Sequence, residues 1–217
     1  MIIRCKYSKL GDIAFVSHLD LLRIFIRALR RESIRLNYSQ GFHPHPKLSF
    51  SPALSLGVES ICEYLDMDVA DEISPQEVQD KLNKALPRGV EILESYPIDK
   101  MGGIATLSTH SRYEFSLDPF DEELEKIVEE IAREEYIPIR KKNKKGKLME
   151  INAKDRIEEI FIRDQKLYAT LLNSVNGAMK PSELLEIIDS KAGKEYDAYQ
   201  ILKKDLYFFD GKGLKLV

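Results

Sequence analysis

The chain has 217 residues, of which 43% are hydrophobic and 32% are charged, and its formal net charge at pH 7 is −3. These values are typical of an ordinary globular protein with one or two compact domains. No apolar run approaches the roughly 20 residues that span a bilayer, and the N-terminal residues lack the apolar core of a secretion signal. We therefore expect a cytoplasmic protein with no membrane partner.

The cysteine content argues against a disulfide framework. Cys5 and Cys62 are the only two cysteines, and free thiols fit a reducing cytoplasm. An iron–sulfur cluster held by three or four cysteines cannot be built from two. The sequence also lacks the glycine motifs that bind nucleoside triphosphates and dinucleotides. We expect no bound cofactor.

The charge is segregated along the chain. Residues 1–58 carry nine basic and three acidic side chains, a net charge of +6. Residues 59–136 carry seven basic and twenty-one acidic side chains, or −14, and residues 137–217 carry seventeen and twelve, or +5. Basic regions of this kind can bind anionic ligands, although charges often only solvate a surface.

The first half of the chain has the pattern of six elements. Residues 17–34 form its clearest helix, with Ser17 as the N-cap and Leu19, Leu22, Ile26 and Leu29 as the buried face. The other elements are a strand over 2–11, strands within 47–57 and 62–71, a helix over 74–86 with Ser74 as the N-cap, and a strand over 89–98.

The second half begins in a similar way. Residues 99–112 contain paired glycines and small polar residues, which predict a linker between a domain of residues 1–98 and a domain of residues 113–217. Strand–helix–strand–strand–helix–strand is the ferredoxin-like unit. The predicted fold is therefore α+β, with two tandem ferredoxin-like units. The second has extra strands, and its elements are a strand over 112–117, a helix over 121–132, a hairpin over 136–152, strands over 156–172, a helix over 180–189 and a hairpin over 204–217.

The most distinctive stretch is GFHPHPKLSFSPALSLG, residues 41–57. Pro44 and Pro46 favour an extended chain, in which His43 and His45 point to one face. Two imidazoles could begin a metal site, but zinc normally needs three or four ligands and the other candidates are scattered, so we expect no metal. The two histidines could instead divide acid and base roles in metal-independent RNA cleavage.

Anion binding is a further interpretation of this region. Lys47, Ser49 and Ser51 would lie on one face of a strand and offer an ammonium group and hydroxyls to phosphate or sugar oxygens. Phe42 could stack on an RNA base, and the preceding helix carries a stripe of arginines. The plainest alternative places Phe42 in the core and makes the prolines a rigid link. The residues predicted to bind are His18, Arg23, Arg27, Arg30, Arg31, Arg35, Phe42, His43, His45, Lys47, Ser49 and Ser51, with Arg140, Lys141, Lys142, Lys144 and Lys145 of the second domain contacting the same ligand.

Two segments, FVSHLDLLRIFIRALRR and YSQGFHPHPKLSFSPALSLGVES, resemble the bacterial radical SAM-linked protein family, a domain of unknown function. The resemblance covers most of the chain and is densest from His18 to Glu59. It implies a radical SAM enzyme as partner, with this chain lacking the cluster itself, and it implies no established activity. The matching residues are His18, Asp20, Gly41, Phe42, His43, Pro44, Pro46, Ser49, Pro52, Gly57 and Glu59.

The leading hypothesis is a non-catalytic RNA-binding accessory protein that works with a radical SAM enzyme. One alternative is a metal-independent endoribonuclease that uses His43 and His45; the tandem fold and the basic histidine loop are loosely similar to the repeat-associated RNA endonucleases of CRISPR systems. Another alternative is a protein-interaction module that docks a radical SAM partner without RNA.

Overall fold

The computed structural model describes residues 1–217 except 143–145, 147 and 174–177. The chain forms two compact units. Unit 1 consists of residues 1–108 and 208–217, and unit 2 consists of residues 109–207. The chain therefore leaves the first unit, builds the second, and returns to the first for its final residues.

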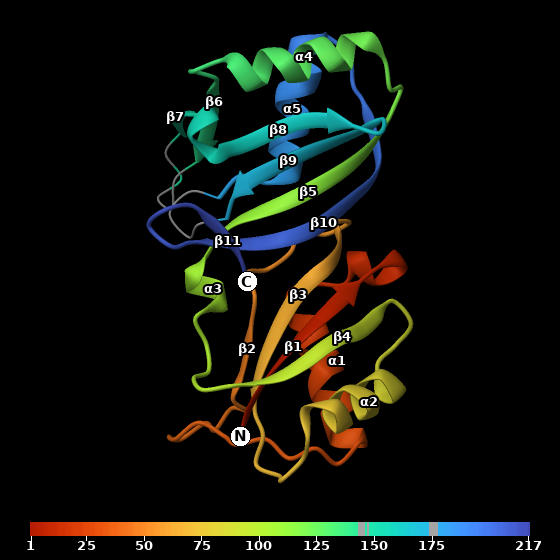
Figure 1. The fold of residues 1–217 in the computed structure, drawn as a ribbon, viewed down its shortest axis with the longest axis vertical. Coiled ribbons are helices and arrows are strands. Elements are labelled where there is room, and N and C mark those ends of the chain that lie inside the picture. The colour runs from red at the N-terminus through yellow and green to blue at the C-terminus, as the bar shows by residue number, and fades with distance from the viewer. Residues whose placement is uncertain (143–145, 147, 174–177) are drawn as a thin grey trace. The chain divides into compact units, whose positions relative to one another are not determined.

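Unit 1 is a sheet with its two long helices on one face (Figure 1). The strand order is β4-β1-β3, β2 also pairs with β3, and these pairs are antiparallel. Its elements are β1 (Ile2–Lys9), η1 (Gly11–Phe15), α1 (His18–Arg31), β2 (Leu48–Phe50), β3 (Glu59–Asp68), α2 (Pro75–Ala85), β4 (Val90–Ile98), α3 (Ile104–Leu107) and β11 (Leu214–Leu216).

The two long helices of unit 1 begin where the sequence predicts. The Ser17 side chain accepts a hydrogen bond from the Asp20 backbone N–H at 3.1 Å, which caps α1. The Ser74 side chain accepts one from Glu77 at 3.1 Å and caps α2. Each cap satisfies one of the backbone N–H groups that the first turn of a helix leaves unpaired. Both predicted N-caps are confirmed.

The buried face of α1 differs from the predicted one. Leu21, Phe25, Ala28 and Leu29 are buried, whereas Leu19 is 63% exposed. The Phe25 ring packs edge-on against other aromatic rings of the core, which turns the 21–25–28–29 stripe toward the sheet. Leu22 and Ile26 therefore lie at the flank of the helix, half-buried, and Ile26 is available to line a surface groove.

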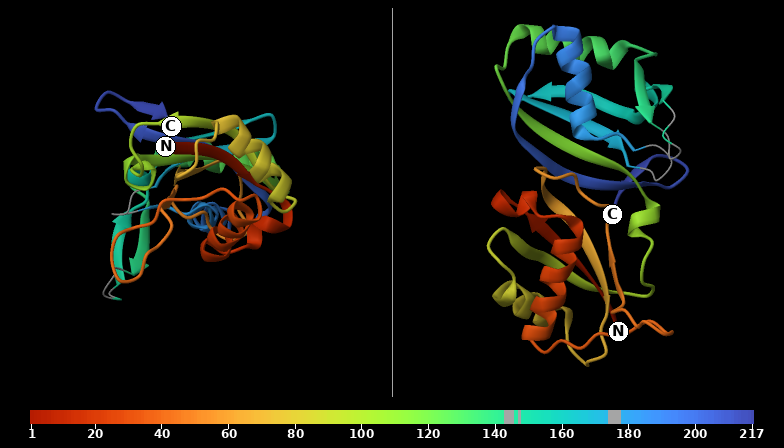
Figure 2. Two further views of the ribbon diagram at one scale, coloured as in Figure 1. Left: turned by 90° about the horizontal axis from the view of Figure 1, so that it is seen from below. Right: turned by 180° about the vertical axis from the view of Figure 1, so that it is seen from behind.

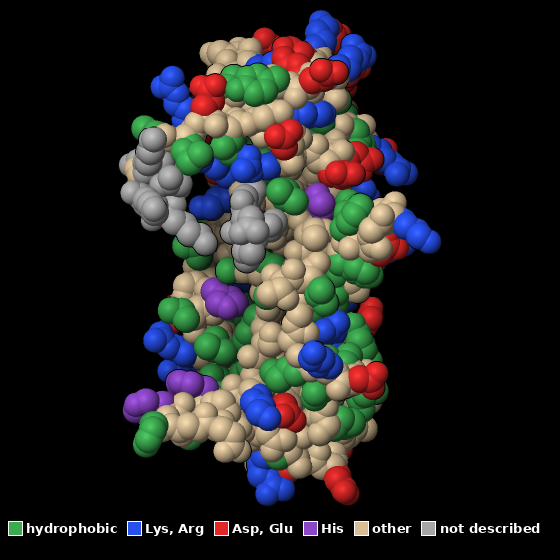
Figure 3. All heavy atoms as spheres, turned by 90° about the vertical axis from the view of Figure 1, so that its left-hand side faces the viewer, with side chains coloured by type: hydrophobic (Ala, Val, Ile, Leu, Met, Phe, Trp, Pro, Cys, Tyr) green, Lys and Arg blue, Asp and Glu red, His purple; other side chains and the backbone are tan. Residues whose placement is uncertain are grey.

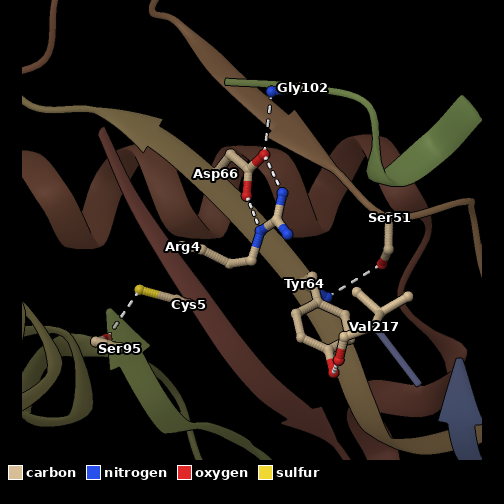
Figure 4. Close-up of polar contacts among 8 residues, drawn as sticks. All are labelled: Arg4, Cys5, Ser51, Tyr64, Asp66, Ser95, Gly102 and Val217. Atoms are coloured by element: carbon tan, nitrogen blue, oxygen red, sulfur yellow. Dashed lines mark hydrogen bonds and ion pairs between the residues drawn. The ribbon is translucent and has the colours of Figure 1, made fainter. Parts of the chain in front are cut away.

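The opposite face of the unit 1 sheet carries a buried ion pair. Arg4 on β1 and Asp66 on β3 lie opposite each other in the strand register, and the Asp66 carboxylate has no exposed surface (Figure 4). The backbone N–H of Gly102 also donates to Asp66 at 3.1 Å. The segment after β4 is thereby fixed over this face of the sheet.

Unit 2 is also a layer of strands with helices on one face (Figure 2). The strand order is β10-β5-β9-β8, and β6 and β7 form a separate two-stranded sheet. Its elements are β5 (Ser108–Asp118), α4 (Glu122–Arg133), β6 (Pro138–Lys142), β7 (Leu148–Asn152), η2 (Lys154–Arg156), β8 (Ile157–Arg163), β9 (Lys166–Leu172), α5 (Pro181–Ala192) and β10 (Asp197–Phe209).

The prediction of a mixed α+β fold is confirmed, with five α-helices in the described part of the chain. The more specific prediction of two tandem ferredoxin-like units stays a prediction. Across the residues that the structure describes, no helix is both long enough and apolar enough to cross a lipid bilayer.

Candidate functional site

A groove of about 640 Å³ lies beside the C-terminal end of α1. Its floor is apolar, and two arginines and one phenol ring stand around it. Grooves of this size and composition are typical of small-ligand sites, in which a few polar groups orient an apolar body. The lining residues are Ile26, Leu29, Arg30, Ser33, Ile34, Arg35, Leu36, Tyr38 and Pro46.

The end of α1 determines one wall of the groove. Ser33 has a left-handed backbone with φ of 57°, and its N–H donates to the carbonyl of Arg30 at 3.1 Å. The N–H of Ile34 donates to the carbonyl of Leu29 at 2.9 Å. This pair of bonds is the Schellman motif, which ends a helix and reverses the chain. The chain therefore runs back along α1 and leaves the groove between them.

The returning segment is held by residues at the end of β3. Leu36 forms an isolated bridge with Val69, and the N–H of Asn37 donates to the Asp68 carbonyl at 2.8 Å. Arg35 is tied to Asp71 twice, through its backbone N–H at 2.7 Å and through its Nε at 2.6 Å. Arg35 is therefore fixed in place, and its charge is partly offset by Asp71.

The histidine–proline stretch forms a projecting loop above this groove. Tyr38 and Pro46 are bridged at its base, and the N–H of Ser39 donates to the carbonyl of His45 at 2.8 Å. Phe42 at the tip is fully exposed, so the alternative that placed it in the core is wrong. Histidine and hydrophobic side chains project together from the face drawn in Figure 3, where basic and acidic side chains are interspersed.

Lys47 is anchored below the loop. Its Nζ lies 3.0 Å from one carboxylate oxygen of Asp68, and the side chain of Asn37 donates to the other oxygen at 2.9 Å. The bond from Asn37, followed by that from Lys47, lowers the pKa of Asp68. Asp68 is therefore ionised at neutral pH and holds the ammonium group of Lys47 in one position.

The arginines of α1 are not equivalent. Arg23 is paired with Asp20 at 2.8 Å, and Arg31 donates to the carbonyl of Ala85 at 2.9 Å. Arg27 and Arg30 are exposed, and their side chains form no hydrogen bond or ion pair with any residue that the structure describes. Of these four arginines, Arg27 and Arg30 thus have guanidinium groups available to an anionic ligand, and only Arg30 lines the groove.

Ser51 has a different role from the predicted one. It is 3% exposed, its hydroxyl donates to Glu63 at 2.8 Å, and it accepts from the N–H of Tyr64 at 3.1 Å (Figure 4). The hydroxyl of Ser60 donates to the other oxygen of Glu63 at 2.8 Å. The prediction that Ser51 shares a solvent-facing strand face with Lys47 is therefore wrong, because β2 ends at residue 50 and Ser51 turns toward the buried carboxylate.

Lys9 lies in the same buried region. It is 2% exposed, and its Nζ donates to the carbonyls of Ala14 at 3.1 Å and Val16 at 2.8 Å. Burial lowers the pKa of Lys9, and the nearby charge of Glu63 opposes this shift. Lys9 thus fixes the turn that precedes α1.

His18 also lies apart from the groove. Its ring meets the edge of Phe50 at 5.4 Å between centroids, and it lines a small cavity of about 10 Å³ with Lys9 and Glu63. A cavity of this size holds at most about one water molecule. His18, which is itself exposed, therefore borders the buried polar cluster of Lys9 and Glu63 and lies apart from His43 and His45.

The basic run of the second half lies in unit 2. Arg140 is exposed on β6, whereas the Nζ of Lys141 is 2.7 Å from the carboxylate of Glu183 on α5. Lys142 is the last residue of β6. The two remaining predicted residues lie outside the described part of the chain; they are Lys144 and Lys145.

The thiols and the other possible metal ligands are dispersed. Within the described residues, no group of three or more His, Cys, Asp or Glu side chains is arranged to hold a metal ion. Cys5 and Cys62 are both buried. Burial raises the pKa of Cys5 to about 12, so its thiol stays protonated at neutral pH.

Comparison with known proteins places the chain in a family. A family model, described as an uncharacterized protein conserved in bacteria (DUF2344), matches residues 3–181. The chain belongs to this family. The DUF2344 match includes all of the groove and the histidine–proline loop. A search of the curated proteins finds no match. The DUF2344 description names no activity and no partner, so a radical SAM partner remains an expectation.

Sequence reasoning missed most of the groove in this DUF2344 member. Arg30 and Arg35 were predicted to bind, but the apolar floor and Tyr38 were not. Tyr38 stands three residues before the loop, and an aromatic residue beside a predicted base-stacking loop was a usable signal. The floor gave no such signal, because its apolar residues have the same pattern as residues of a helix core.

Proposed function

We propose that this DUF2344 protein binds RNA without cleaving it and acts as an accessory to a radical SAM enzyme. The groove beside α1 is the observation that carries the RNA proposal. It combines an apolar floor, the phenol ring of Tyr38 and the unpaired guanidinium of Arg30, and it adjoins the exposed loop that bears Phe42.

These groups match the parts of a nucleotide. The flat, weakly polar base packs on the apolar floor and against Tyr38, and Phe42 stacks on a neighbouring base. Arg27 and Arg30 neutralise phosphates on the flank of the helix. A base can enter the groove only when it is unstacked, so the preferred ligand is single-stranded rather than duplex RNA.

The histidines support binding rather than cleavage. General acid–base catalysis needs an imidazole that is held and oriented toward the reacting proton. The rings of His43 and His45 are exposed and form no hydrogen bond with the described residues. In the proposal they contact a base or a sugar from the tip of the loop.

We also infer that both units are ferredoxin-like. The element order β1-α1-β2-β3-α2-β4 with its antiparallel pairs supports this for unit 1. In unit 2 the order β10-β5-β9-β8 supports it, with β6 and β7 as an insertion after α4. The fold alone assigns no activity. The radical SAM partner rests on the signature residues from His18 to Glu59.

The test uses the full-length protein and a short fluorescein-labelled single-stranded RNA of mixed sequence, with the matched duplex as control. Fluorescence anisotropy is expected to show tighter binding of the single strand, and gel electrophoresis in the presence of a chelator is expected to show intact RNA. His43→Ala should change affinity alone. Cleavage that disappears in both His43→Ala and His45→Ala would instead establish the ribonuclease alternative.

Absence of binding to either RNA would overturn the RNA proposal. A pull-down with a radical SAM enzyme of the same organism then tests the docking alternative. If Phe42→Ala releases that enzyme while RNA binding is absent in the unmodified protein, the loop is a protein-docking surface.

A further inference from the structure

A second groove, of about 340 Å³, lies in unit 2 between α4 and β8. Val128 and Ala132 of α4 and Ile160 and Ile162 of β8 give it an apolar floor. Two glutamates of α4 form its rim and are exposed; they are Glu125 and Glu129. RNA binding in unit 1 uses none of these residues.

One side of this groove is the open edge of a sheet. Within the described residues, β8 ends the strand order and pairs only with β9. The two strands join through Asp164 and Gln165, whose φ values are 51° and 55°, as in a two-residue hairpin turn. Arg163 and Lys166 flank the turn and form a hydrogen-bonded pair, and such pairs alternate along an antiparallel ladder. The backbone groups of Ile160 and Ile162 therefore point to the open edge.

The two halves of β8 differ in how this edge is protected. Proteins commonly block an open edge with a bulge or with charged side chains. The first half of β8 has both, because the register shifts between Ile157 and Glu159 and the segment carries two consecutive glutamates. The second half, from Ile160 to Ile162, is apolar and has neither device. It is also the part that lines the groove.

The charged side chains around the groove determine whether it favours a positively or a negatively charged ligand. Helix α4 has five glutamates against Lys126 and Arg133, and Lys154 adds one ammonium group at the end of the groove, where its Nζ donates to the Ala132 carbonyl at 2.8 Å. Arg133 pairs with Glu129 at 2.9 Å, but both side chains are more than half exposed, so solvent screens the pair. Glu125 forms no ion pair with any residue that the structure describes. The rim therefore repels phosphate and attracts cationic side chains.

We propose that the α4–β8 groove binds an extended basic segment of a partner protein by β-strand addition. The segment pairs with the free N–H and C=O groups of Ile160 and Ile162, as peptides do at other open sheet edges. Side chains two residues apart point to the same face, so an apolar side chain enters the floor beside Val128 while a lysine or arginine two residues away reaches Glu125 on the same helix. This inference does not depend on the RNA proposal, because the two grooves share no residue.

The probe is the peptide Thr-Val-Thr-Lys-Thr-Val-Thr-Lys-amide with fluorescein on its N-terminal amine, in which valine and lysine share one face of the strand, and its control has glutamate in place of lysine. Binding to the full-length protein is followed by anisotropy and by amide hydrogen exchange of ¹⁵N-labelled protein. The lysine peptide is expected to bind and to slow exchange at Ile160 and Ile162, by about tenfold when nearly all sites are filled. Equal binding of the glutamate peptide, or unchanged exchange at these two amides, would overturn the proposal.

Two variants locate the site. Glu125→Lys should weaken the peptide about tenfold or more, whereas Glu122→Lys on the same helix but outside the groove should have a much smaller effect. Ile162→Pro removes an outward-facing N–H and should abolish binding, whereas Ile162→Val keeps it. If the proline variant does not fold, hydrogen exchange at Ile160 and Ile162 and the affinity of the Glu125→Lys variant test the proposal. Exchange protection that appears without peptide and grows with protein concentration would mean that a second copy occupies the edge, and the partner proposal would be wrong.

Discussion

Arg4 donates two hydrogen bonds to the buried carboxylate of Asp66 (Figure 4). The distance from Nε to Oδ1 is 2.7 Å, and the distance from Nη2 to Oδ2 is 3.0 Å. The two residues face each other across β1 and β3, and Gly102 adds a third hydrogen bond to the same carboxylate. A charge-assisted bidentate pair is among the stronger polar contacts in a protein.

We expect Arg4→Leu to destabilise the protein by about 3–5 kcal/mol, because it leaves the charge of Asp66 buried without a counter-ion. Urea unfolding followed by circular dichroism measures the change. Lys6→Leu on the same strand is the matched control. The Nζ of Lys6 is 4.0 Å from the exposed carboxylate of Glu94, so its loss should cost less than about 1 kcal/mol. Equal losses in both variants would contradict this account of the pair.

Ser33 is a site where a substitution should stabilise the protein. A residue with a side chain costs roughly 1 kcal/mol in the left-handed conformation that the end of α1 requires, and glycine avoids this cost. Ser33→Gly should raise the free energy of unfolding by up to about 1 kcal/mol. Glu32→Gly is the control, because Glu32 has an ordinary φ of −88° and glycine brings no benefit there. A Ser33→Gly variant that is no more stable than the unmodified protein would contradict this expectation.

Asp121 should make the stability of unit 2 depend on acid pH. Hydrogen bonds from Lys194, from the N–H of Leu124 and from Tyr196 lower the pKa of Asp121 from 3.8 to about 2. A carboxylate with a lowered pKa stabilises the fold fully above its unfolded pKa, and this contribution is lost as pH falls through the folded pKa. The contribution is therefore present above about pH 4 and disappears between about pH 4 and pH 2.

Asp121→Asn tests this dependence, because asparagine keeps the N-cap of α4 but cannot ionise. Its urea midpoint should fall less steeply than that of the unmodified protein as the pH is lowered through this window. Asp197→Asn, at an exposed position, should follow the unmodified protein. Parallel curves for the Asp121 variant and the unmodified protein would rule out the assigned role.

Local sequence signals predicted the helix starts well, because Ser17 and Ser74 act on backbone groups only a few residues away. The groove could not be predicted in this way. It forms only when the left-handed backbone of Ser33 turns the chain back along α1 and when Pro46, at the other end of the loop, pairs with Tyr38. The burial of Ser51 likewise depends on Glu63, which lies on another strand. The alternating pattern of residues 47–51 does not indicate that Glu63 is the partner of Ser51.

The structure also sharpens which arginines should matter for RNA. Arg27 and Arg30 are available, so replacing both by glutamine should make the slope of log affinity against log salt shallower by about 1.4, at roughly 0.7 for each phosphate on a single strand. Arg23→Gln is the control, since Arg23 is already paired with Asp20, and it should change the slope much less. Titrations of labelled single-stranded RNA at several salt concentrations measure these slopes. An unchanged slope in the double variant would exclude the helix flank as a phosphate contact.

The most direct test of RNA binding in the groove is ultraviolet crosslinking of the protein to RNA in cells, followed by mass spectrometry of the crosslinked peptides and sequencing of the RNA. Aromatic residues that stack on bases are the expected crosslinking sites. The account predicts adducts on Tyr38 or Phe42, lost in Tyr38→Leu and Phe42→Leu, with a defined set of RNAs recovered. Adducts confined to residues outside 26–47, or no RNA above the level of an untagged strain, would contradict it.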